Sequence, residues 1–168
     1  MIDLHSTERP ASGAGPAIVE VRAATTSDIA AIAQLVAVHV RQGHLLPRRA
    51  ADIEASLATW IVATSGDTLV GCGALLQLGP DLVEVRSLAV KQSWRRSGIG
   101  PASFRRSLRR RAQDARRVLA LTRAVTFFER QGFTVAPIHQ FPEKVARTCV
   151  GCARRAVRDE TALVQHFA

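Results

Sequence analysis

The stretch from Leu82 to Gly100 contains residues that could do chemistry. Glu84 is a carboxylate within an otherwise apolar segment, and burial strengthens a carboxylate as an acceptor of protons. A basic turn with two glycines follows, and free backbone amides beside arginines at a helix start suit an anion. The candidate anion-binding residues are Arg95, Arg96, Ser97, Gly98, Ile99 and Gly100. The stretch therefore predicts a proton acceptor close to an anion site.

Glu84 also has a plainer interpretation, in which it lies on a solvated face of a strand and pairs with Arg86. Strict alternation along a strand places Glu84, Arg86 and Leu88 on one face and Ser87 on the other. A pocket that receives both Glu84 and Ser87 therefore requires a β-bulge in this strand. The sequence leaves both interpretations of Glu84 open.

The rest of the chain must position this stretch, and its pattern favours an α/β fold with a mixed, mostly antiparallel sheet. Residues 1–16 are rich in Ser, Gly, Pro and charge and predict a flexible tail, and residues 17–168 predict one domain. Apolar periodicity and turn signals define the expected elements. We expect strands at 18–23, 60–63, 68–78, 82–90, 118–121, 132–135 and 161–167, and helices at 29–40, 50–57, 100–114, 125–131 and after Pro142.

The 168 residues carry a formal net charge of +9, which suits an acidic partner such as nucleic acid, an anionic cofactor or an acidic small molecule. No apolar run is long enough to span a membrane. The N-terminus lacks the apolar core of a secretory signal, so we expect a cytoplasmic protein. The sequence leaves the oligomeric state open, a homodimer included.

The three cysteines do not make a disulfide framework. Cys149 and Cys152 are spaced like metal ligands, but a structural metal site usually needs a second pair of ligands, and the sequence offers none. We therefore expect no metal. Cys72 falls within an apolar strand and is expected in the core.

The turn Arg95-Arg-Ser-Gly-Ile-Gly100 resembles the pyrophosphate-binding motif of the GNAT acyltransferase superfamily, and the segment from Thr126 to Phe133 resembles the late helix, turn and strand of that superfamily. The resemblance implies a single-domain GNAT fold and acetyl transfer from acetyl-CoA to an amine. It implies that the diphosphate of the cofactor lies on the turn. The pantetheine arm would then pair with the backbone of Leu88, Ala89 and Val90 as an added strand.

A narrower resemblance is to the acetyltransferase domain of N-acetylglutamate synthase, in its short stand-alone form. It is carried by three segments, which are Gly43–Arg49, Val83–Val90 and Leu121–Phe128, and by the tail from Phe141. The resemblance implies that L-glutamate is the acceptor, in the first step of arginine biosynthesis, and that Glu84 is the general base. Because glutamate carries two carboxylates, its pocket needs cations. The candidate substrate-binding residues are Arg48, Arg86, Ser87, Lys144 and Arg154.

Two departures from these families leave the general acid open. Phe128 stands where many GNAT enzymes have a tyrosine, and Leu121 stands where the synthase family has a serine. Thr122, Ser87 or solvent could protonate the leaving thiolate, or no dedicated acid is needed. Two other functions also remain open. One is acetylation of another small-molecule or protein amine. The other is a nucleic-acid-binding module, suggested by arginines in 104–117 but lacking interleaved aromatic residues.

Overall fold

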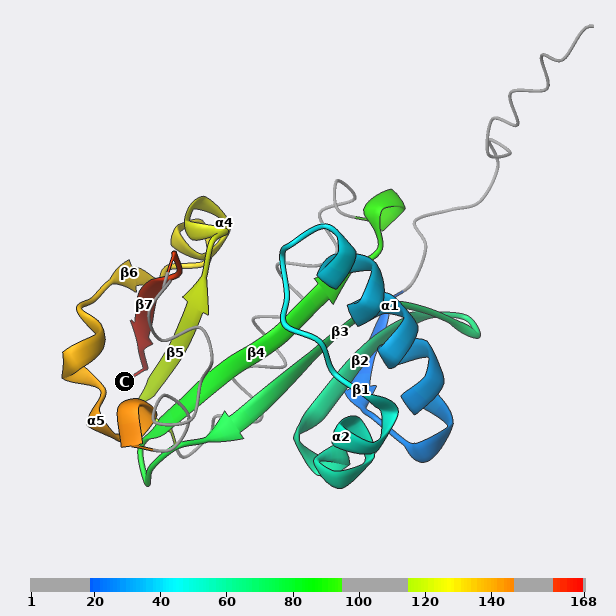
Figure 1. Ribbon diagram of the computed structural model, residues 1–168, viewed down its shortest axis with the longest axis horizontal. Coiled ribbons are helices and arrows are strands. Elements are labelled where there is room, and N and C mark those ends of the chain that lie inside the picture. The colour runs from blue at the N-terminus through cyan, green and yellow to red at the C-terminus, as the bar shows by residue number, and fades with distance from the viewer. Residues whose placement is uncertain (1–18, 95–114, 147–158, 168) are drawn as a thin grey trace, which may run out of the picture.

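The computed structural model describes residues 19–94, 115–146 and 159–167 (Figure 1). The predicted tail at 1–16 and the predicted helix at 100–114 lie outside these ranges. The elements are β1 Glu20–Ala23, η1 Thr26–Asp28, α1 Ile29–Arg41, α2 Ala50–Ala55, η2 Leu57–Thr59, β2 Trp60–Ser65, β3 Thr68–Gln77, β4 Leu82–Val90, η3 Gln92–Trp94, β5 Arg117–Thr122, α4 Val125–Glu129, β6 Thr134–Val135, η4 Ile138–Gln140, α5 Pro142–Lys144 and β7 Thr161–His166.

The described strands form one seven-stranded sheet in the order β1-β2-β3-β4-β5-β7-β6. The pairing of β4 with β5 is parallel, and the other neighbouring strands are antiparallel. This confirms the predicted α/β fold with a mixed, mostly antiparallel sheet. Within the described residues, β4 pairs with β5 only from Leu82 to Val85, and beyond that point the two strands diverge (Figure 1). The second half of β4 is thus left without β5 beside it.

Several predicted elements are shorter than expected, and the predicted helix at 125–131, for example, ends at Glu129. The predicted helix at 50–57 ends at Ala55 and is followed by the separate turn η2. The predicted strand at 132–135 is only Thr134–Val135. Gly132 has a φ of 91°, and the Phe133 N–H donates to the carbonyl of Phe128 at 3.1 Å. Residues 132 and 133 therefore close the end of α4 instead of extending the strand.

Two apolar clusters cover one face of the sheet. The first lies under α1 and α2 and includes Ile32, Ile53 and Ala74. The second lies under α5 and joins Phe141 to Leu82, and its other members are Leu78, Leu119, Ala136, Ala162 and Val164. Leu82 of β4 belongs to the second cluster, and Ala74 of β3, which faces Arg86, belongs to the first. Positions 84 and 86 of β4 lie on the same face as Leu82 and therefore lie between the two clusters. A third cluster, including Val83 and Val85, covers the opposite face.

The turn η1, which leads into α1, is fixed by an ion pair and by a capping bond to Asp28. Asp28 accepts hydrogen bonds from Arg22 Nη1 at 2.7 Å and Nη2 at 2.9 Å, and from the backbone N–H of Thr25 at 2.7 Å. The Arg22 guanidinium is the largest of the influences that hold the pKa of Asp28 well below its usual value of 3.8. A carboxyl whose pKa is lowered on folding stabilises the protein above its unfolded pKa, and that stabilisation is lost as the pH falls.

The variant Asp28→Asn should therefore lower the free energy of unfolding by about 1–2 kcal/mol at pH 7. The difference from the parent protein should narrow as the pH is lowered through the usual carboxyl range near 3.8. Urea unfolding at pH 7 and at pH 3 measures both effects. An equal difference at the two pH values would show that the charge of Asp28 contributes nothing.

In the ranges that the structure describes, no helix combines the length and the apolar character needed to cross a membrane.

Candidate active site

A β-bulge in β4 organises the site. Cys72 of β3 faces Ala89, and Ala74 faces Arg86, so that two residues of β4 oppose Gly73 alone. Those two residues are Ser87 and Leu88, and Ser87 has a φ of 51°, which is unusual for a residue with a side chain. The bulge that the sequence required for Glu84 and Ser87 to share a pocket is therefore present.

The bulge reverses the alternation of side chains in the second half of β4. Leu88 packs against the cluster of Val83 and Val85, whereas Ala89 belongs to the cluster under α1. The prediction from strict alternation that Leu88 shares a face with Glu84 is therefore wrong. The extra residue turns the following side chains over, and Ser87 reaches the face of Glu84 and Arg86.

Glu84 is buried, with 3% of its surface exposed. Its Oε1 accepts a hydrogen bond from Nζ of Lys144 at 2.5 Å, and its Oε2 lies 3.9 Å from Nε of Arg86. Oε2 has no hydrogen-bond partner among the described residues. The interpretation that Glu84 lies on a solvated face is wrong, although the expected pairing with Arg86 exists as a loose ion pair. One carboxylate oxygen is anchored, and the other can accept a proton.

Arg48 reaches the same place from the loop between α1 and α2. Its Nε donates a hydrogen bond to Oγ of Ser87 at 3.3 Å. Burial lowers the pKa of Arg48, the charge of Arg86 lowers it further, and the charge of Glu84 opposes both. Arg48 and Arg86 thus lie close enough to repel each other. Such a pair of like charges favours a bound anion.

The structure brings together five of the predicted site residues, which are Arg48, Glu84, Arg86, Ser87 and Lys144. They come from β4, from the loop before α2 and from α5, and they meet between the two apolar clusters on one face. The predicted residues Arg95, Arg96, Ser97, Gly98, Ile99, Gly100 and Arg154 lie outside the described ranges. Leu88, Ala89 and Val90 form the part of β4 that extends beyond its pairing with β5.

Sequence reasoning missed His39, a buried residue near the end of α1. Its Nε2 lies 3.2 Å from the carbonyl oxygen of Val90, so Nε2 carries the proton and donates it. Val90 is one of the residues expected to pair with the pantetheine arm.

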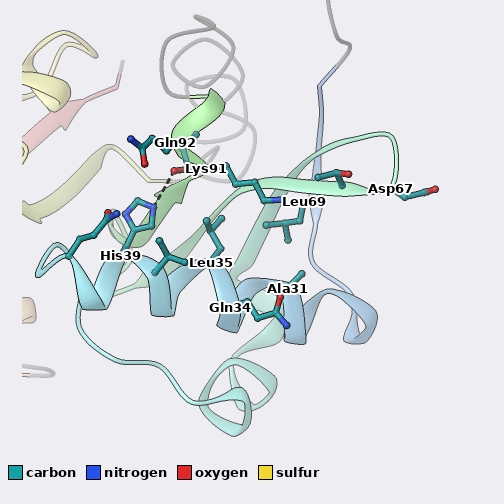
Figure 2. A pocket seen from close by; sticks show the side chains of 12 residues that line it. Ala31, Gln34, Leu35, His39, Asp67, Leu69, Lys91 and Gln92 are labelled. Atoms are coloured by element: carbon teal, nitrogen blue, oxygen red, sulfur yellow. Dashed lines mark hydrogen bonds between the residues drawn. The ribbon is translucent and has the colours of Figure 1, made fainter. Parts of the chain in front are cut away.

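His39 and Val90 also line a hollow of about 490 Å³ between α1 and the adjoining ends of β3 and β4 (Figure 2). Leu35, Lys91 and Gln92 lie on its walls. The hollow contains none of the residues grouped around Glu84. The hollow is therefore separate from the cluster of charged side chains around Glu84.

Arg123 is a second residue that sequence reasoning missed. It donates hydrogen bonds to the carbonyl of Gly43 and, at 2.8 Å, to Oδ1 of Asp159. Gly43 begins the loop that carries Arg48, and Arg123 follows β5. The contact between Arg123 and Gly43 joins residues that are 80 apart in the sequence, so no local sequence pattern predicts it. It ties the loop of Arg48 to the strand beside β4.

Two hydroxyl groups that the sequence suggested as proton donors act as acceptors in their described hydrogen bonds. Oγ of Ser87 accepts from Arg48, and Oγ1 of Thr122 accepts from the N–H of Ala124 at 2.9 Å. Phe128, which the resemblance matches to a tyrosine of many GNAT enzymes, is buried and packs edge-on against Phe127 and Phe133. The ring at position 128 is part of the core.

The described residues contain no group of three or more His, Cys, Asp or Glu side chains that could hold a metal ion. Cys149 and Cys152 lie outside the described ranges. Cys72 is buried in the core as predicted, and burial raises the pKa of its thiol to about 12. This thiol stays protonated at neutral pH and is unsuited to ligation or nucleophilic attack.

Comparison with known proteins adds a family to this geometry. The model of the acetyltransferase (GNAT) domain matches residues 56–135. An uncharacterized N-acetyltransferase of Chlorobaculum tepidum is 30% identical over 146 residues, which cover 86% of this chain and 94% of that protein. An amino-acid acetyltransferase of Mycobacterium tuberculosis is 39% identical over 118 residues, which cover 68% of this chain and 67% of that protein.

A solved structure also resembles most of this chain. It is the N-acetylglutamate synthase of Neisseria gonorrhoeae complexed with coenzyme A and N-acetyl-glutamate, with a TM-score of 0.80 and 26% identity. The match covers 92% of this chain and 36% of that protein. The chain therefore corresponds to about a third of the longer protein.

Proposed function

Because this chain belongs to the GNAT acetyltransferase family, we propose that it transfers the acetyl group of acetyl-CoA to the α-amine of L-glutamate and forms N-acetylglutamate. A relative at 39% identity is named an amino-acid acetyltransferase, and a similar structure is an N-acetylglutamate synthase. These likenesses support an amino acid as the acceptor. The charges of the site support an acidic one.

The observation that carries the proposal is the grouping of three cationic side chains around one carboxylate. Arg48, Arg86 and Lys144 face Glu84, and Lys144 is already bonded to it. Two guanidinium groups are left in excess. L-Glutamate brings two carboxylates, which would compensate both, and guanidinium binds carboxylate with fork geometry. A polyamine would meet like charge here.

Glu84 would act as the general base. Its Oε2 would accept a proton from the ammonium group of the acceptor, directly or through a water molecule, while Lys144 holds Oε1 in place. The free amine would attack the thioester carbonyl, so that a C–N bond forms and the C–S bond breaks. After the attack the nitrogen carries one proton more than the amide product, and it would release that proton as the C–S bond breaks. The thiolate would leave with the electrons of that bond and take up a proton by way of Ser87, Thr122 or solvent. A thiolate is a good leaving group, and the acid can be weak.

The donor would lie along the second half of β4. Leu88, Ala89 and Val90 extend past the pairing with β5, and an extended amide-rich arm could add to the sheet there. The diphosphate would follow at Arg95–Gly100, as the motif implies. This arrangement would deliver the thioester beside Ser87, at the bulge.

The test is an acetyl-transfer assay that follows release of the CoA thiol with a panel of amines. The panel contains L-glutamate, L-aspartate, L-glutamine, spermidine and a short peptide with a free N-terminus. We expect kcat/KM for L-glutamate to exceed that for L-glutamine by about tenfold or more, because glutamine leaves one cation without a carboxylate. If no glutamate-dependent release occurs, the proposal fails, and the amine that reacts best identifies the acceptor.

A further inference from the structure

We infer that Arg117 is a positioning residue for the general base, because it holds Glu143 and so seats the adjacent Lys144 against Glu84. The inference rests on the proposed role of Glu84. It assigns to Lys144 the task of orienting the base, in contrast to the substrate-binding role that the sequence suggested. Arg117 itself touches none of the reacting groups.

Arg117 begins β5 and joins the turn before β4 to α5. Its Nε donates to Oδ2 of Asp81 at 3.0 Å and its Nη2 to Oδ1 at 3.1 Å. The same Nη2 donates to Oε1 of Glu143 at 3.2 Å. The backbone N–H of Arg117 also donates to the carbonyl of Asp81 at 2.8 Å. These bonds fix the guanidinium in one orientation, with one edge presented to Glu143.

The helix α5 spans Pro142–Lys144 and passes into a π-helical turn at Val145 and Ala146, so its α-helical part offers few contacts of its own. Its first turn is anchored below by Phe141, which is 2% exposed and packs in the cluster with Leu82. Phe141 anchors one side of the turn, and its carbonyl accepts from the backbone N–H groups of Lys144 and Val145. The side of the turn that carries Glu143 has no such apolar anchor among the described residues. The bond from Arg117 to Glu143 holds that side.

Without Arg117, the carboxylate of Glu143 would compete with Glu84 for the ammonium group of Lys144. Oε1 of Glu143 accepts a hydrogen bond from Arg117. Oε2 of Glu143 is buried and has no hydrogen-bond partner among the described residues. Without the guanidinium, the carboxylate of Glu143 would seek another cation, and Lys144 is adjacent. An ammonium drawn away from Glu84 would leave the base with Arg86 at 3.9 Å and Arg48.

The first experiment measures pH–rate profiles of the full chain and of Arg117→Gln. We expect kcat to fall about tenfold, since small displacements of a catalytic group are costly. We expect the acidic limb of the profile to move up by about one pH unit, because the base loses the ammonium group bonded to its Oε1, and a nearby cation favours the charged form of a carboxyl. The control is Arg22→Gln, which removes another arginine bonded through two nitrogens to an aspartate, away from the site.

A double-mutant cycle separates positioning from lost stability. If Arg117 acts through Lys144, then Arg117→Gln should change kcat by less than about twofold in a Lys144→Met background, because the effects are coupled. The inference is overturned if the two effects multiply, or if Arg117→Gln keeps the pH profile of the parent protein. The cycle is run with whichever amine the parent protein acetylates, so that a failure of L-glutamate as acceptor is scored separately.

A second measurement is independent of turnover. The sequence contains only two lysines, Lys91 and Lys144. Labelling with acetic anhydride and mass spectrometry should therefore report Lys144 against Lys91 as an internal reference. Lys144 is 6% exposed and ion-paired, so it should react slowly in the parent protein and in Arg22→Gln. It should react at least severalfold faster in Arg117→Gln, and an unchanged ratio would overturn the inference.

Discussion

Replacement of Glu84 by glutamine is expected to lower kcat by about a hundred- to ten-thousand-fold, the usual contribution of a positioned general base. Glutamine keeps the size of the side chain and its carbonyl oxygen can still accept from Lys144, but it cannot take a proton from the acceptor ammonium. Affinity for acetyl-CoA, measured by calorimetry, should stay the same. The comparison uses steady-state rates at saturating concentrations of both substrates.

Two variants make this result interpretable. Glu54→Gln changes an exposed glutamate of α2 and should leave kcat unchanged. Glu84→Gln combined with Lys144→Met removes the buried lysine that the single variant leaves without a carboxylate, and such a charge is costly to keep unpaired. If the double variant folds normally and retains more than about a third of the parent kcat, Glu84 is not the base.

The second large effect is expected for Arg48→Gln, which should raise KM for L-glutamate by about ten- to a hundredfold, the value of a hydrogen bond between charged groups. The effect on kcat should be small, because Arg48 is proposed to bind a carboxylate that takes no part in the bond changes. KM for acetyl-CoA should not move. Initial rates at varied glutamate and fixed saturating acetyl-CoA separate these parameters.

Arg49 offers a matched control in the next position. Its side chain is 85% exposed and pairs with Asp52 at 3.2 Å, whereas Arg48 is half-buried and bonded to Ser87. Arg49→Gln removes the same charge from the same loop without touching the site. Equal rises of KM in both variants would mean that the net charge of the loop, and not the position of Arg48, attracts the acceptor.

The local parts of this site could be predicted from the sequence. Glu84, Arg86 and Ser87 lie within four residues of one strand, whose boundaries were predicted correctly because it is apolar and bounded by turn residues. The bulge could be predicted only as a condition for Glu84 and Ser87 to share a pocket. Its effect on Leu88 could not be predicted, because alternation carries no information about where an extra residue is inserted.

The distant parts of the site could not be derived from spacing. Arg48 is 39 residues from Ser87, and Lys144 is 60 residues from Glu84. Both were candidates because a dicarboxylate needs cations and because of family resemblance. Neither argument shows that the ammonium of Lys144 bonds to Glu84, since that partner depends on the packing of Phe141 beside Leu82 and on the contact of Glu143 with Arg117. The contacts of Arg117 and Arg123 are hidden from the sequence for the same reason.

The short parallel pairing between β4 and β5, here called the seam, also affects how the chain folds. The antiparallel strands β1 to β4 lie between residues 20 and 90, and β2, β3 and β4 pair with their sequence neighbours, so this half consists largely of local contacts. The seam joins Leu82–Val85 to Arg117–Ala120 and must close a longer loop first. Glu84 belongs to the half that is synthesised first and Lys144 to the half that follows. The base and its lysine therefore meet only when these two halves of the sheet have joined.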